Sequence, residues 1–151
     1  EAGLVETLEE VARSGTPLLG ICLGMQLLFD SSEEYGFHRG LGLLPGTVER
    51  FRGDFKIPHM GWNRLTLLKQ HPLFEGIEGG HAYFVHSYRV IPADRNDLLA
   101  STDYYGEVAA IVGRGNVFGM QFHPEKSGQT GLRLLGNFLK LTSLNAGRER
   151  R

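Results

Sequence analysis

The chain has 151 residues, enough for one domain with a sizeable core, and its formal net charge is −1 when the six histidines are neutral. Charged residues make up 22% of it, and this balance argues against nucleic acid or a membrane surface as a binding partner. The single cysteine excludes an internal disulfide and favours a reducing compartment, so we expect a cytoplasmic protein. The longest apolar run, residues 17–29, is too short to cross a bilayer.

The first part of the chain predicts a helix, a strand and a second helix. Apolar residues between positions 4 and 12 lie on one helical face, and Gly15 ends that helix. Residues 17–21 form a short apolar run that is typical of a strand buried on both faces. Residues 24–29 return to a helical pattern, and residues 31–46, rich in glycine and charge, are predicted to be a loop.

The middle of the chain predicts strands. They are expected at residues 47–51, 62–67, 83–90, 98–102, 108–112 and 116–122. The tripeptide Gly-Arg-Gly at residues 113–115 is predicted to be the hairpin loop between the last two of them.

A final helix is predicted to begin near Ser127 or Thr130, either of which could cap it. Its buried face is expected to consist of Leu132, Leu135, Phe138 and Leu139. Because helices flank the strands at both ends of the chain, we expect an α/β domain over residues 1–142. Residues 143–151 are expected to be a solvated basic tail.

The only cysteine lies in the segment Gly20-Ile21-Cys22-Leu23-Gly24, where the predicted strand meets the next helix. A nucleophile between two glycines at a strand-to-helix turn is the nucleophile-elbow pattern, with Cys in place of Ser. The glycines are expected to prevent collisions beside the turn. The N-terminus of the helix is expected to favour the thiolate of Cys22, and the backbone N–H of Leu23 to face an oxyanion. The alternative is a buried structural cysteine.

A cysteine nucleophile needs a base, and His123 is the best placed of the six histidines. It directly follows a predicted strand, and Pro124 favours an extended or turned backbone at this position. Residues two apart in an extended segment share a face, so Glu125 can lie beside the His123 ring and fix its tautomer. The two segments together predict a triad of Cys22, His123 and Glu125. The alternative is a histidine at a strand end and a solvated glutamate.

These residues resemble the two signatures of the class I glutamine amidotransferases. The elbow continues as Met25-Gln26, and the second signature reads Gln121-Phe122-His123-Pro124-Glu125. Other segments resemble the glutaminase subunit of imidazole glycerol phosphate synthase; they are Ser31-Ser32-Glu33-Glu34, Gly40-Leu41-Gly42-Leu43-Leu44-Pro45-Gly46, Pro58-His59-Met60-Gly61-Trp62-Asn63, Tyr83-Phe84-Val85-His86-Ser87-Tyr88 and Glu125-Lys126-Ser127. The resemblance extends from about residue 4 to residue 139.

The resemblance implies an open α/β sheet with flanking helices and the hydrolysis of glutamine. Cys22 would attack the side-chain amide carbon, His123 would transfer the thiol proton to the departing ammonia, and Glu125 would orient His123. The ammonia would pass to a (β/α)₈-barrel cyclase subunit in a heterodimer. That subunit would make imidazole glycerol phosphate and an aminoimidazole carboxamide ribonucleotide in histidine biosynthesis. The resemblance implies no metal and no organic cofactor.

The resemblance also implies which residues bind the substrate. Gln26 and Glu34 would contact the amino-acid end of glutamine, and Ser87 and Tyr88 would line the same pocket. A carboxylate suits an α-ammonium group, and hydroxyl or backbone groups suit an α-carboxylate. The alternative for Glu34 is a solvated loop charge.

Four further residues would face the partner subunit: Trp62, Asn63, Tyr83 and Lys126. Trp62 is the only tryptophan, and protein interfaces favour Trp and Tyr as anchors. Trp62 and Tyr83 could instead be core residues of their strands.

Two other functions are consistent with the sequence. A different class I amidotransferase would keep the triad but use another ammonia acceptor, and Met25 and the Trp62-Asn63 pair argue against it. A non-catalytic module that only binds a partner would not need Cys22, His123 and Glu125 intact.

Relatives carry an N-terminal strand-helix-strand portion and a Pro-Gly-rich loop before the helix that begins here near Leu4. That loop supplies a second oxyanion donor and closes one side of the glutamine pocket. We therefore expect Glu1–Arg151 to be part of a longer chain. Made alone, it should be poorly soluble because one edge of the elbow strand is bare. It should also be nearly inactive, since one oxyanion donor is worth about 10²–10³ in rate.

Overall fold

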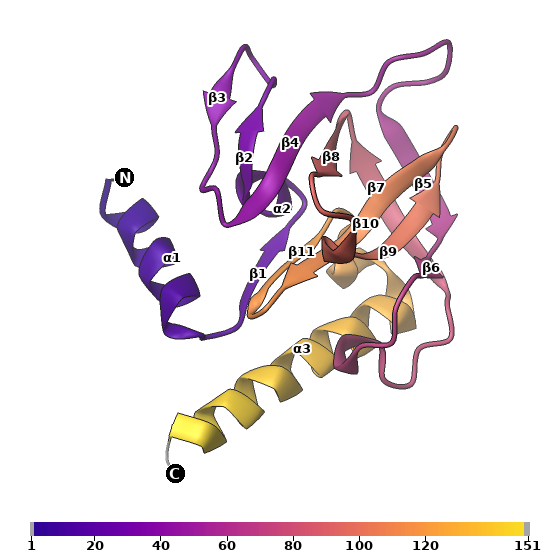
Figure 1. Ribbon diagram of the computed structural model, residues 1–151. Helices are drawn as coiled ribbons and strands as arrows, with labels where there is room; N and C mark the ends of the chain where they lie inside the picture. Colours follow the sequence, from indigo (N-terminus) through magenta and orange to yellow (C-terminus); the bar gives the residue numbers. More distant parts are fainter. Residues whose placement is uncertain (1, 150–151) are drawn as a thin grey trace.

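The structure is a computed structural model that describes residues 2–149, and it contains three β-sheets and three α-helices within that range (Figure 1). The helices are α1 (Ala2–Ser14), α2 (Leu23–Leu27) and α3 (Gly128–Glu149). The strands are β1 (Leu18–Ile21), β2 (Phe29–Ser32), β3 (His38–Arg39), β4 (Leu44–Arg50), β5 (His59–Arg64), β6 (Thr66–Leu67), β7 (His81–His86), β8 (Tyr88–Pro92), β9 (Leu98–Asp103), β10 (Glu107–Arg114) and β11 (Val117–Met120). Short 3₁₀ turns are η1 (Pro72–Phe74), η2 (Arg95–Asp97) and η3 (Pro124–Lys126).

The largest sheet has the strand order β1-β11-β10-β9-β6. In this sheet β1 runs parallel to β11, with Ile21 opposite Met120, and the other neighbours are antiparallel. A second sheet has the order β3-β2-β4-β8, and β5 pairs with β7 separately. Because β1 and β11 are parallel, the segments that follow them leave the sheet at the same edge.

Side chains that alternate along the strands build one core on each face of the largest sheet. On one face, Phe118 and Met120 of β11 share a core with Leu134 of α3. On the other face, the neighbouring Val117 shares a core with Met25 of α2 and with strands of the second sheet. Figure 1 shows α3 running along one side of the sheet and β2, β3 and β4 on the other. This two-sided burial holds the ends of β1 and β11 in place.

The predicted helices and strands are largely present, with four corrections in the middle of the chain. The hairpin loop expected at residues 113–115 lies at residues 115–116, because Gly113 and Arg114 pair with β11 as part of β10. The expected strand at 62–67 is divided into β5 and β6, and that at 83–90 into β7 and β8, which join different sheets. The expected loop at 31–46 contains the end of β2, all of β3 and the start of β4. The strands β2 and β3 have only four and two residues, which is too short for an alternating pattern to be recognised. They are strands because they pair with one another in the second sheet, and their own residue pattern does not predict this.

The elbow strand β1 is less buried than its apolar sequence predicts. Leu18 and Leu19 face the two opposite cores, but both are only partly buried, and Gly20 is the one buried residue of the strand. Among the described strands, β1 pairs with β11 alone. A strand with one neighbour leaves its other edge open, which explains the difference.

The final helix is present, but only half of its predicted buried face is correct: Leu135 and Phe138 are half-buried, and Phe138 packs against the core. Leu132 and Leu139 are 65% and 62% exposed, whereas Asn137 is buried. The Asn137 Nδ2 atom donates to the carbonyl oxygens of Leu73 and Glu75, at 2.8 and 2.9 Å. A pattern of apolar residues does not include a buried amide such as Asn137, so the prediction placed Leu132 and Leu139 in the core by mistake.

The helix α3 continues to Glu149 and thus includes part of the segment predicted to be a basic tail. The last two residues of that segment lie outside the described residues, and the domain boundary at residue 142 stays a prediction. None of the described helices is long and apolar enough to cross a lipid bilayer.

The start of α3 approaches η3 so closely that a methyl group on Gly131 would lie 1.9 Å from the carbonyl oxygen of Pro124. We expect Gly131→Ala to lower the free energy of unfolding by about 1–3 kcal/mol, as other overpacked sites do. Gly136→Ala is the matched control in the same helix, because a methyl group there meets nothing within 4 Å. It should raise stability by up to about 1 kcal/mol. Urea unfolding measures both, and equal effects would contradict the close approach.

Candidate active site

Cys22 lies at the sharp turn between β1 and α2. Its φ of 54° and ψ of −108° are rare for a residue with a side chain. Its backbone N–H donates to the carbonyl oxygen of Met120 at 2.7 Å, which ties the turn to the end of β11. A strained residue at a strand-to-helix junction is the geometry of a nucleophile elbow.

The two glycines of the elbow differ in their importance. A methyl group on Gly20 would lie 2.5 Å from the carbonyl oxygen of Gly24 and 2.8 Å from the backbone nitrogen of Met25. Gly20 therefore allows the strand to pass close to the first turn of α2. A methyl group on Gly24 would meet nothing within 4 Å, so packing does not require glycine there, contrary to the expectation from the spacing.

Opposing influences act on the thiol of Cys22. Burial raises its pKa above the ordinary value, and the carboxylates of Glu125 and Glu34 add to this effect. The backbone N–H of Leu23 and the side-chain amide of Gln121 donate to the sulfur and lower the pKa. The N–H of Leu23, the first residue of α2, does favour the thiolate as expected, but burial outweighs it and the net pKa is raised. The helix α2 has only five residues, and desolvation outweighs its N–H groups.

His123 and Glu125 form a close pair after β11. The Nδ1 atom of His123 lies 2.9 Å from Oε1 of Glu125, so the expected contact is present. His123 is extended, but Glu125 lies in η3, and a 3₁₀ turn rather than an extended segment brings the two together. Because an ionised carboxylate only accepts, His123 donates from Nδ1 and keeps a lone pair on Nε2. That lone pair is what a general base needs.

The three predicted triad residues lie at one edge of the largest sheet. Cys22 and His123 follow the paired parallel strands β1 and β11, and the charge of Glu125 reaches the thiol. Within residues 2–149, no hydrogen bond joins the Cys22 sulfur to the His123 ring. Catalytic hydrogen bonds are often long without substrate and tighten in the reacting complex. The contact with Glu125 therefore orients the His123 ring, and a hydrogen bond between the ring and the Cys22 sulfur would form only when substrate is bound.

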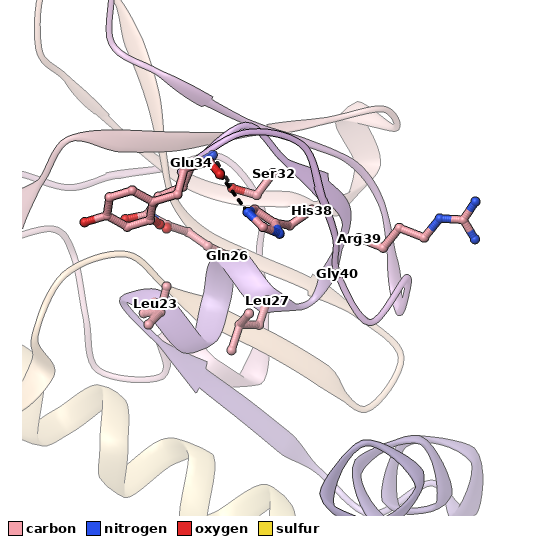
Figure 2. Close-up of a pocket in the computed structure, with 9 residues that line it drawn as sticks. Leu23, Gln26, Leu27, Ser32, Glu34, His38, Arg39 and Gly40 are labelled. Atoms are coloured by element: carbon pink, nitrogen blue, oxygen red, sulfur yellow. Dashed lines mark hydrogen bonds between the residues drawn. The ribbon is translucent and has the colours of Figure 1, made fainter. Parts of the chain in front are cut away.

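A pocket of about 290 Å³ opens beside the elbow, between α2 and residues 32–40 (Figure 2). Leu23 and Gln26 line it from α2, and Glu34 and His38 line it from the opposite segment. Figure 2 shows the Arg39 side chain pointing away from the pocket. The pocket has the size of a site for a small ligand. Within the described residues, no group of three His, Cys, Asp or Glu side chains is placed to hold a metal ion.

Two of the four predicted substrate-binding residues line this pocket and two do not. Gln26 and Glu34 line it, whereas Ser87 and Tyr88 do not. The Gln26 amide nitrogen donates to the carbonyl oxygen of Tyr88 at 3.2 Å and to Oε1 of Gln121 at 3.3 Å. Tyr88 thus supports the pocket through its backbone. The roles of all four residues in binding glutamine stay predictions.

The sequence reasoning did not single out three residues of this region. Tyr35 and His38 line the pocket, and the His38 Nε2 atom lies 2.9 Å from the carbonyl oxygen of Tyr35. Tyr35 lies in the loop between β2 and β3, and His38 begins the two-residue strand β3, so no sequence periodicity points to either residue. Gln121 is completely buried behind the sulfur. Its position two residues before His123 was a usable signal, since alternate residues of an extended segment share a face.

The predicted partner-facing residues lie on β5, on β7 and after β11. Trp62 and Tyr83 stand opposite each other on β5 and β7, with ring centroids 5.9 Å apart in an edge-to-face arrangement. Trp62 is 56% exposed, so the alternative that it is a core residue is wrong. Lys126 is exposed in η3, and the Asn63 side chain is engaged within the chain. Their role at an interface stays a prediction.

A family model of the class-I glutamine amidotransferases matches residues 2–141. The chain belongs to this family. The triad signatures, the elbow and the family match therefore agree, and the predicted fold class is confirmed for this amidotransferase.

The amidotransferase is similar to several curated proteins over most of its length. The imidazole glycerol phosphate synthase subunit HisH of Geobacillus kaustophilus is 55% identical over 149 residues, covering 95% of this chain and 71% of that protein. The subunit HisH of Halobacterium salinarum is 53% identical over 141 residues, covering 89% of this chain and 65% of that protein. The resemblance drawn from the motifs is thus confirmed along nearly the whole chain.

Two solved structures share the fold. A glutamine amidotransferase is 23% identical with a TM-score of 0.70, covering 93% of this chain and 69% of that chain. A glutamine amidotransferase from Thermotoga maritima is 18% identical with a TM-score of 0.63, covering 96% of this chain and 56% of that chain.

A buried pair of histidines joins β5, β7 and β8 of the amidotransferase. The Nδ1 atom of His59 lies 2.9 Å from Nε2 of His86, and His86 donates from Nδ1 to the carbonyl oxygen of Tyr88 at 2.7 Å. At the other end, Nε2 of His59 lies 2.8 Å from Oδ1 of Asn63, whose Nδ2 donates to the carbonyl oxygen of Asp103 at 3.1 Å. Both histidines have partners on both ring nitrogens, as expected for structural residues.

Burial lowers the pKa of His86 from 6.5 to about 4. In this pH range the unfolded chain binds a proton that the folded chain does not, so stability is present above the unfolded pKa and is lost as the pH falls. His86 alone should lower the free energy of unfolding by up to about 1.4 kcal/mol per pH unit as the pH falls from 6.5 to about 4. Urea unfolding between pH 7 and about pH 4 measures this slope.

The variant His86→Gln tests this assignment. It should make the slope shallower but not flat, because burial also lowers the pKa values of His59 and His71. His81→Gln, at an exposed position, is the matched control and should leave the slope as it is. A wild-type slope in the His86 variant would assign the pH dependence to other groups.

Proposed function

We propose that this amidotransferase hydrolyses glutamine to glutamate and ammonia and delivers the ammonia to the cyclase subunit of imidazole glycerol phosphate synthase. The cyclase makes imidazole glycerol phosphate and an aminoimidazole carboxamide ribonucleotide in histidine biosynthesis. One observation carries this proposal: the chain is 55% and 53% identical to two Geobacillus HisH subunits, over 95% and 99% of its length. The family match supports the glutaminase chemistry.

Cys22 is the proposed nucleophile. Its sulfur attacks the side-chain amide carbon of glutamine, and the elbow geometry supports this role. Because the net pKa of the thiol is raised, a base has to take the thiol proton as the carbon–sulfur bond forms. The proton then passes to the departing nitrogen, and ammonia leaves a γ-glutamyl thioester. Water hydrolyses the thioester, which releases glutamate and restores the thiol.

His123 is the proposed base and Leu23 the proposed oxyanion donor. The 2.9 Å contact between Nδ1 of His123 and Glu125 leaves Nε2 free to take the thiol proton. The backbone N–H of Leu23 contacts the sulfur, so it is close to the carbon that the sulfur attacks. A fixed N–H donor at that place stabilises the tetrahedral intermediate.

Glutamine is proposed to bind in the pocket between α2 and residues 32–40. Glu34 carries the charge that suits the α-ammonium group of the substrate. Gln26 would offer its oxygen to the substrate, because its amide nitrogen already donates to Tyr88 and Gln121. Ser87 and Tyr88 would support the pocket from behind, through the backbone.

The proposed partner is a (β/α)₈-barrel cyclase, bound as a heterodimer in the cytoplasm. The exposed Trp62, in contact with Tyr83, is suited to anchor such an interface, with Lys126 beside it in η3. The backbone of Tyr83 accepts from the N–H of His123 at 3.1 Å and donates to Oγ of Ser127 at 2.9 Å. A partner that docks on β7 would therefore act directly on the backbone that holds the base.

Cys22→Ala should abolish glutamine-dependent synthesis by the complex and leave ammonia-dependent synthesis intact. The physical reason is that Cys22 makes ammonia and takes no part in the cyclase step. Loss of a triad nucleophile lowers the rate by several orders of magnitude. Formation of imidazole glycerol phosphate is measured with glutamine and, separately, with an ammonium salt. Glutamine-dependent product at a wild-type rate would contradict the proposed nucleophile.

The isolated subunit should release little glutamate, and the complex with acceptor nucleotide bound should release it much faster. The reason is the link between β7 and His123, through which docking can change the arrangement of the triad. Glutamate release is measured for the subunit, for the complex, and for the complex with nucleotide. Equal rates in all three would show that docking does not control this site.

A further inference from the structure

Gln121 lies between the nucleophile and the substrate pocket. It is completely buried, and its Nε2 atom donates to the Cys22 sulfur at 3.9 Å, within the range of hydrogen bonds to sulfur. Its Oε1 atom accepts from the Gln26 amide at 3.3 Å. Its own backbone N–H donates to the carbonyl oxygen of Ala110 at 2.9 Å, so its main chain is fixed to β10. The nitrogen and the oxygen of the buried Gln121 side-chain amide therefore each form a hydrogen bond.

The direction of these hydrogen bonds follows from the carbonyl oxygen of Tyr88. A carbonyl oxygen can only accept, so the Gln26 group that contacts it at 3.2 Å must be the NH₂ group. The same NH₂ group faces Gln121, which must then present its oxygen to Gln26. The remaining group of Gln121, its NH₂, consequently faces the Cys22 sulfur. A reversed Gln121 amide would set two donors against each other in a buried place.

We propose that Gln121 is a positioning residue for the nucleophile, which directs an N–H donor at the Cys22 sulfur and holds Gln26 at the wall of the substrate pocket. This inference rests on the proposed glutaminase function and assigns a further residue to it. The N–H dipole favours a negative sulfur and opposes burial and the charges of Glu125 and Glu34, which favour the neutral thiol. Gln121 thus limits how far the thiol pKa rises.

The competing explanation is that Gln121 only fills the space between β11 and α2. The two explanations differ in their dependence on pH. A donor aimed at the sulfur changes the pH at which the thiol ionises and leaves the reactivity of the ionised sulfur alone. A space-filling residue would change access to the sulfur equally at every pH. The rate of alkylation of Cys22 against pH separates these cases, and Cys22 is the only cysteine of the chain.

The experiment compares Gln121→Met and Gln121→Glu with the wild-type subunit. Iodoacetamide labelling of the Cys22 peptide is followed by mass spectrometry between about pH 6 and pH 10. Gln121→Met removes the donor at similar size, so the profile should shift upward by about one pH unit, with about a tenfold lower rate at pH 7. The limiting rate at high pH should not change. Gln70→Met, at an exposed position, is the matched control and should give the wild-type profile.

Gln121→Glu keeps the shape of the side chain but replaces the donor with a negative charge. It should shift the profile further than Gln121→Met does. A space-filling role predicts the reverse order, because the Glu variant has the shape of the wild type. That reverse order, an unshifted profile in both variants, or a change that is equal at every pH would overturn the proposal. The assay needs no glutamine, so a failure of the proposed glutaminase function would appear separately, as absent glutamate release.

Discussion

The parallel pairing of β1 with β11 is the constraint on which the rest of the site depends. It sets Ile21 opposite Met120, so the residues that follow them leave the sheet at the same edge. The hydrogen bond from the Cys22 backbone to Met120 extends this register into the elbow. A slip of one residue would send every side chain of the strand to the opposite face of the sheet, and His123 would no longer follow its strand at the level of the nucleophile. The positions of the nucleophile, the base and Gln121 therefore all depend on the pairing of β1 with β11.

The surroundings of the Cys22 sulfur include groups that favour the thiolate and groups that favour the neutral thiol. Burial and two carboxylates favour the neutral thiol, whereas Leu23 and Gln121 donate to the sulfur and favour the thiolate. The short helix α2 does not decide this balance. A thiol that is neutral until a base engages it reacts slowly at neutral pH without its substrate, and this suits an enzyme that would otherwise waste glutamine. The proposed control by a partner is compatible with such a site.

The carbonyl oxygen of Tyr88 joins two parts of the molecule. It accepts from Gln26, at the wall of the pocket, and from the ring of His86, which contacts His59. His59 and its partner Asn63 both lie on β5, the strand that carries the exposed Trp62. One polar network thus connects the pocket with the strand of the proposed docking surface.

The sequence by itself determined the family, the elbow and the pair of His123 and Glu125. These features depend on residues a few positions apart, and the short chain between such residues restricts how they can be arranged in space. Only the tertiary structure decided that Asn137 of α3 is buried, because its partner Leu73 belongs to the turn η1, far away in the chain. It also decided the strands within residues 31–46, the raised pKa of Cys22 and the place of Gln121. Burial and hydrogen bonding of a polar group depend on neighbours far away in the chain, and no local pattern records those neighbours.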